Sequence, residues 1–108
     1  MNEEAIVREI VNECLDPEGF LVKLRTHNTL DKKTFQWLLA ELKAYSHSIA
    51  DRQTINRSLA GCLFAIQEAL DNYVQTLDKR YIDVQEYQYA QNAFAEVYET
   101  TLDIFRIP

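Results

Sequence analysis

The sequence predicts an all-α, single-domain bundle of about five helices. Only two of its 108 residues are glycine and two are proline, so it lacks the turn residues that a β-rich or loop-rich fold requires. Apolar residues recur every three or four positions over long stretches, which is the spacing of amphipathic helices. Four aspartates also follow an apolar residue and precede another one four positions later, the pattern of a helix N-cap with a hydrophobic staple: Asp16, Asp31, Asp51 and Asp83.

The first two predicted helices are short. One spans about 3–14, with its apolar face formed by Ile6, Val7, Ile10, Val11 and Cys14. The second spans about 17–27, with Asp16 as its cap and Pro17 at its first position, where proline is well tolerated. Its inward residues are Phe20, Leu21 and Leu24.

The third predicted helix spans about 32–49 and is capped by Asp31. Its apolar side carries Phe35, Leu38, Leu39, Leu42, Tyr45 and Ile49. The junction with the next helix contains neither glycine nor proline, so either a tight turn capped by Asp51 or one continuous helix fits the sequence. We favour the turn, because the capping pattern is present there.

The last two predicted helices form an antiparallel hairpin, because both carry a heptad-like seam. The fourth spans about 52–79, with Leu59, Leu63, Ile66, Leu70, Tyr73 and Leu77 along its seam. The fifth spans about 83–106 and opens with a capping box made by Asp83 and Glu86. Its predicted seam is Val84, Tyr87, Gln91, Phe94, Tyr98, Thr101 and Phe105.

The length of the fourth predicted helix suggests self-association. A helix of about 28 residues is ~42 Å long, whereas a compact globule of this size is ~34 Å across. One end should therefore project or be covered by a second copy, which makes a homodimer the leading hypothesis. An elongated monomer and a helix break near Gly61 are the alternatives.

The charge distribution limits the classes of partner. The net charge is −6, and residues 81–108 carry one basic and five acidic groups. Such an acidic end disfavours nucleic acids and anionic membranes and is compatible with a basic protein. The acidic start, Met1–Glu4, does not resemble a signal peptide, and no apolar run reaches the ~18 residues of a membrane span. We expect a cytoplasmic protein.

The sequence contains no recognisable catalytic, cofactor or metal site. Neither His27 nor His47 stands three residues after a glutamate, so the Glu-x-x-His pair of di-iron bundles is absent, and no glycine-rich loop or strand-to-helix serine elbow is present. Cys14 and Cys62 fit no metal or redox spacing, and each lies on an apolar helix face as a small hydrophobic residue. We therefore expect a non-enzyme without cofactor or metal.

Three aromatic residues lie away from the predicted core stripes. Trp37 points opposite Phe35 and Leu42, where it either packs under the first two helices or meets a partner. Phe64, one turn after Gly61, fits either an internal or an intermolecular contact. Tyr89 shares its stripe with polar residues, and the candidate protein-interaction surface is therefore Tyr89, Asn92, Glu96, Glu99, Asp103, Phe64 and Trp37.

Three functions are compatible with these features. The first is a helical protein–protein interaction module (an adaptor, assembly factor or regulator) that self-associates. The alternative is a small acidic antagonist, of the immunity type, that neutralises a basic protein partner through the fifth helix. The third is a small-ligand binder with a pocket between helices, lined by Tyr45, Tyr73, Tyr87 and Tyr98.

Overall fold

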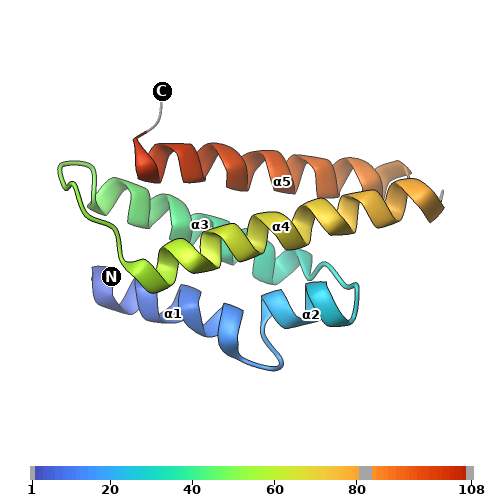
Figure 1. The fold of residues 1–108 in the computed structure, drawn as a ribbon, viewed down its shortest axis with the longest axis horizontal. Helices are drawn as coiled ribbons and strands as arrows, with labels where there is room; N and C mark the ends of the chain where they lie inside the picture. The colour runs from blue at the N-terminus through green and yellow to red at the C-terminus, as the bar shows by residue number, and fades with distance from the viewer. Residues whose placement is uncertain (1, 81–83, 107–108) are drawn as a thin grey trace.

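In the part of the chain that the structure describes, five helices pack in an all-α bundle, as the sequence predicts (Figure 1). The computed structural model describes residues 2–80 and 84–106. The helices are α1 (Glu3–Leu15), α2 (Phe20–Thr26), α3 (Lys32–Ser48), α4 (Arg57–Arg80) and α5 (Val84–Phe105). Two short helices thus precede three long ones, which confirms the predicted order.

The five helices occupy four columns. α1 contacts α3 and α4, and α5 contacts the same two helices from the other side. α2 extends the column of α1 and packs on α4, so α1 and α2 together oppose α5 across the bundle (Figure 1). α4 and α5 form the antiparallel hairpin and share the most extensive interface. The result is a flat molecule with principal extents of 44 × 32 × 19 Å.

The start of α3 follows the predicted capping pattern. The Asp31 carboxylate accepts hydrogen bonds from the Thr34 amide at 3.2 Å and from the Thr34 hydroxyl at 2.9 Å. These two hydrogen bonds are the main reason why the pKa of Asp31 is lowered. Leu30 and Phe35, the two predicted staple residues, are both buried.

The predicted start of the second helix is wrong. Asp16 ends α1 instead of starting α2, and its carboxylate accepts a hydrogen bond from the Glu18 amide at 2.8 Å within the connecting turn. α2 begins at Phe20, whose amide donates to Glu13 Oε1 at 2.9 Å. The predicted staple fails because Leu15 is 74% exposed.

α3 and α4 are separate helices, but the predicted cap of α4 is wrong. α4 begins at Arg57, five residues later than expected, and Asn56 replaces Asp51 as the cap by accepting a hydrogen bond from the Leu59 amide at 3.0 Å. The buried Tyr45 hydroxyl accepts from the Asn56 amide at 3.1 Å, so a tertiary contact fixes the start of the helix. The predicted capping box at Asp83 lies outside the described residues.

The predicted seam of α4 is correct, whereas that of α5 is wrong. Every seam residue of α4 is buried. Of the seven predicted seam residues of α5, all of which the structure describes, Thr101 alone is buried, and Val84 and Tyr98 are 72% and 50% exposed. The buried face of α5 is instead Ala90, Ala93, Val97, Thr100, Thr101 and Ile104. Small side chains on that face allow the axis of α5 to approach the axes of the helices on which it packs.

Candidate interaction surfaces

Large apolar side chains collect on the outer surface of the α4–α5 hairpin. We call this surface the aromatic face and define it as Phe64 and Val74 of α4 with Phe94, Tyr98 and Phe105 of α5. Phe64 is 64% exposed and Tyr98 is 50% exposed, while the other three are partly buried. The rings pair: Phe64 and Phe105 lie 6.2 Å apart between centroids, and Phe94 and Tyr98 lie 6.3 Å apart.

The aromatic face combines a ridge with a groove. The Phe64–Phe105 pair forms the ridge, near the start of α4 and the end of α5. Farther along the hairpin lies an open groove of about 390 Å³. It is lined by Val74 and Asp71 of α4 and by Gln91, Phe94, Ala95 and Tyr98 of α5. The groove is mainly apolar, and its polar side chains include Asp71 of α4 and Gln91 of α5.

Sequence reasoning placed most of this surface in the core. Phe94, Tyr98 and Phe105 belonged to the predicted α5 seam, although Phe64 was correctly placed off the α4 seam. The signal that identifies the true buried face is a second stripe of mostly smaller residues on α5, which begins with Ala90 and Ala93. Both stripes have helical spacing, so periodicity alone does not distinguish them.

Tyr89 packs against the chain itself. It is half-buried, and its ring meets Phe35 edge-on with centroids 6.3 Å apart. Its hydroxyl accepts a hydrogen bond from Gln36 Nε2 at 2.9 Å, and Lys32 Nζ lies 4.8 Å from the ring centroid, within cation–π range. These contacts give Tyr89 a structural role between α3 and α5.

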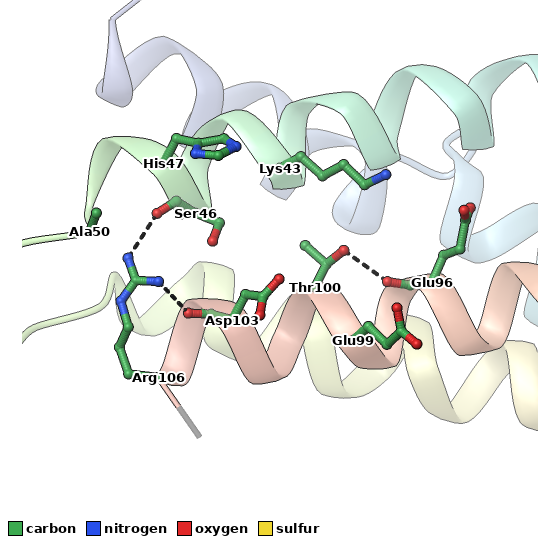
Figure 2. A pocket seen from close by; sticks show the side chains of 9 residues that line it. All are labelled: Lys43, Ser46, His47, Ala50, Glu96, Glu99, Thr100, Asp103 and Arg106. Carbon is green, nitrogen blue, oxygen red and sulfur yellow. Dashed lines mark hydrogen bonds between the residues drawn. The ribbon is translucent and has the colours of Figure 1, made fainter. Parts of the chain in front are cut away.

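The acidic residues predicted for the interaction surface line a polar cleft between α3 and α5. Glu96, Glu99 and Asp103 form one wall of this cleft of about 490 Å³, and the α3 wall includes Lys43 and His47 (Figure 2). At one end, the Arg106 guanidinium donates to the Ser46 carbonyl at 3.0 Å and to the Asp103 carbonyl at 2.8 Å. The cleft therefore carries both signs of charge. Asn92 and Tyr89 line a neighbouring groove of about 370 Å³.

The remaining predicted surface residues lie on other sides of the bundle. Phe64 belongs to the aromatic face, and Trp37 lies on α3 one turn before Glu41, which faces α1. Trp37 is 38% exposed, and Ala40 and Ala44 on the same side of α3 are exposed too. This side of α3 is therefore not buried under the first two helices, which is one of the two positions that the sequence allows for Trp37. A Cβ atom built on Gly61 meets nothing within 4 Å, so no part of the described chain approaches it closely.

The inward tyrosines do not converge on an enclosed cavity. The Tyr45 hydroxyl accepts from the Asn56 amide, the Tyr73 hydroxyl donates to Glu86 at 2.9 Å, and the Tyr87 hydroxyl accepts from Gln91 at 3.0 Å. Within residues 2–80 and 84–106, no three His, Cys, Asp or Glu side chains are grouped in a way that suits a metal ion. In the same residues, no helix combines the length and apolarity needed to cross a bilayer.

No protein-family model, curated protein or solved structure matches this chain. Its function is therefore inferred from the geometry of these surfaces.

Proposed function

We propose that this protein is a non-enzymatic, cytoplasmic interaction module (an adaptor, assembly factor or regulator) that self-associates through the aromatic face. One observation carries the proposal: α5 buries a stripe of mostly smaller residues, whereas Phe94, Tyr98 and Phe105 on its other apolar stripe are exposed or only partly buried. Packing within one chain favours the opposite arrangement, since burying a Phe or Tyr removes much more apolar area from water than burying an Ala. Clustered exposed aromatic residues of this kind mark interaction sites.

The size of the face suits a modest dimer interface. α5 has 22 residues, so it is ~33 Å long, and two adjacent helices are about 20 Å wide. This gives on the order of 700 Å² before side-chain relief is counted, against ~800 Å² per partner in a standard interface.

The arrangement of ridge and groove supports a second copy of the chain as the occupant. Phe64 precedes Val74 by ten residues of α4, so the ridge and the groove lie ~15 Å apart along one helix. In a two-fold symmetric pair, the ridge of each copy enters the groove of the other, which makes both contacts equivalent. We propose no nucleic acid, membrane or cofactor as a partner.

The alternative, an acidic antagonist of a basic protein, has weaker support. Glu96, Glu99 and Asp103 converge on the α3–α5 cleft, but Lys43 and Arg106 line the same cleft and offset part of that charge. Charge complementarity to a basic partner is reduced accordingly. A small-ligand site has the least support, because the grooves are open and the inward tyrosine hydroxyls bind internal groups.

Absolute mass in solution tests the proposal. We expect light scattering to give a dimer at micromolar to millimolar concentrations, with little change between low and high salt because the face is apolar. Phe64→Glu and Tyr98→Glu should each yield monomers with unchanged helical circular dichroism. Leu15→Glu is the matched control, since it adds the same charge at an exposed leucine of α1 and should remain dimeric.

Two outcomes would refute the proposal. A monomer at every concentration and salt level would exclude self-association. Dimers that persist in both aromatic-face variants would place the contact elsewhere on the molecule.

A further inference from the structure

A single arginine joins the C-terminal ends of α3 and α5. The Arg106 guanidinium donates one hydrogen bond to the Ser46 carbonyl at 3.0 Å, in the last turn of α3, and another to the Asp103 carbonyl at 2.8 Å, in the last turn of α5 (Figure 2). The last carbonyl groups of a helix lack intrahelical partners, and the helix dipole makes that end negative. One cation therefore satisfies carbonyl groups at two helix ends.

The backbone at Arg106 has a conformation that arginine does not favour. Its φ is 59°, in the left-handed region, and its amide donates to the Asp103 carbonyl at 3.2 Å. Glycine or asparagine usually occupies such a position after a helix. Among the described residues, the other non-glycine residue with a positive φ is Asn28, whose side chain tolerates it. Because a strained backbone persists only where its surroundings fix it, we attribute the conformation of Arg106 to its two side-chain hydrogen bonds.

The strained residue directly follows Phe105, which forms the ridge of the aromatic face with Phe64. Phe105 is the last residue of α5, and helix ends fray unless a contact holds them. Its ring lies 6.2 Å from that of Phe64 between centroids. The geometry of the ridge therefore depends on the last turn of α5, which Arg106 ties to α3.

We propose that Arg106 is a positioning residue for self-association: its hydrogen bond to α3 holds the last turn of α5, so that Phe105 stays beside Phe64 and the ridge is formed before a second copy arrives. This role rests on the proposed function, since it requires the aromatic face to be the contact between copies. An ordered ridge removes the free energy of ordering it from the cost of association. If the last turn were held in only about a third of the molecules, the dissociation constant of the dimer would rise about tenfold, because both copies contribute a ridge.

The substitution Arg106→Gly separates this role from a general effect on stability. Glycine adopts the left-handed conformation without strain, which offsets the loss of the hydrogen bond to Ser46. Measured at low protein concentration, where both chains are monomers, the variant should therefore unfold in urea almost as the wild type does. The dissociation constant of its dimer, from sedimentation or light scattering, should rise about tenfold. Amide hydrogen exchange in the last turn of α5 should quicken in the same variant.

Two further variants distinguish the anchor from the charge. Arg106→Lys keeps the charge and a hydrogen-bond donor but loses the planar fork, so it should recover part of the wild-type affinity. Lys43→Gln removes a positive charge from the α3 wall of the same cleft without touching the last turn of α5. It should dimerise as the wild type does.

The outcomes separate this role from the proposed function. A dimer that Phe64→Glu abolishes, but that keeps the wild-type dissociation constant in Arg106→Gly, would overturn the role of Arg106 and leave the proposed function standing. An equal rise in the dissociation constant for Lys43→Gln would assign the effect to charge and would also overturn the role. A wild-type chain that stays monomeric would refute the proposed function itself, and this role with it.

Discussion

Replacing Glu41 with glutamine should stabilise the protein at neutral pH. Glu41 lies on α3, is only 9% exposed, and among the described residues no group donates a hydrogen bond to its Oε2 atom. Its carboxyl interacts with the carboxyl of Glu9 on α1. Burial first, and then repulsion from Glu9, raise the pKa of Glu41. The ionised form is therefore unfavourable in the folded state.

The expected gain follows from the cost of the unpaired buried oxygen. A buried polar group without its hydrogen bond costs ~1–3 kcal/mol. The amide of Glu41→Gln is neutral and can donate to the Glu9 carboxylate, so we expect the free energy of unfolding to increase by about 1–2 kcal/mol. In a domain of this size, that change corresponds to a rise in Tm of roughly 4–10 °C.

The gain should depend on pH in one direction. Because the pKa of Glu41 is raised in the folded state, the native protein binds this proton more tightly than the unfolded chain does. The protonated carboxyl contributes stability below the unfolded pKa of about 4.3, and that stability is lost as pH rises through the folded pKa. Urea unfolding, followed by circular dichroism, should show a large advantage for Glu41→Gln at neutral pH and almost none at about pH 4.

Two further variants separate this explanation from a general charge effect. Glu9→Gln removes the same repulsion, so combining it with Glu41→Gln should give less than the sum of the two single gains. Glu4→Gln removes one negative charge from an exposed position on α1 and should change little. A neutral-pH stability for Glu41→Gln equal to or below that of the wild type, or an equal gain at both pH values, would refute the reasoning.

Three other predictions concern the helix ends and the two glycines. Gly61→Ala should stabilise the protein by about 1 kcal/mol, because Gly61 lies at an exposed position inside α4 with free space around it. Gly19→Ala should destabilise the protein, because the added Cβ would lie 2.5 Å from a backbone carbonyl oxygen of α1. Thermal unfolding of the two variants tests this prediction, and an increase in Tm for both would contradict it. Asn56→Ala should lower the free energy of unfolding by about 1 kcal/mol through loss of the α4 cap, whereas Asp51→Ala should lower it hardly at all. The reverse order of the two variants in urea unfolding would instead support Asp51 as the cap. Tyr45→Phe should also cost about 1 kcal/mol, because the Asn56 amide loses its acceptor, and hydrogen exchange at that amide should quicken.

Local interactions account for the parts of the fold that the sequence predicts well. The cap at Asp31 depends on hydrogen bonds to Thr34, only three residues away. The seam of α4 contains only apolar residues, and its opposite side is largely polar, so a single face can be buried. Each of these features lies within a single helix and does not depend on the neighbouring helices.

Capping patterns failed where a tertiary contact competed with them. Asp16 and Asp51 have the same local pattern as Asp31, but neither is the N-cap of a helix. The start of α2 is fixed by the Glu13 side chain from the end of α1, and the start of α4 is fixed by the buried Tyr45 hydroxyl. A carboxylate at the right spacing therefore does not by itself decide where a helix begins.

The sequence by itself determined that this chain is all-α, that its helices follow one another in this order, and that α4 buries a continuous apolar seam. The tertiary structure alone decided which side of α5 faces inward, because that helix carries two apolar stripes with the same period. The stripe with Ala90 and Ala93 lets the neighbouring helices approach closely, and much of the aromatic stripe is left on the surface. Spacing along the chain specifies the faces of single helices, whereas side-chain size and the packing of distant helices specify which faces meet.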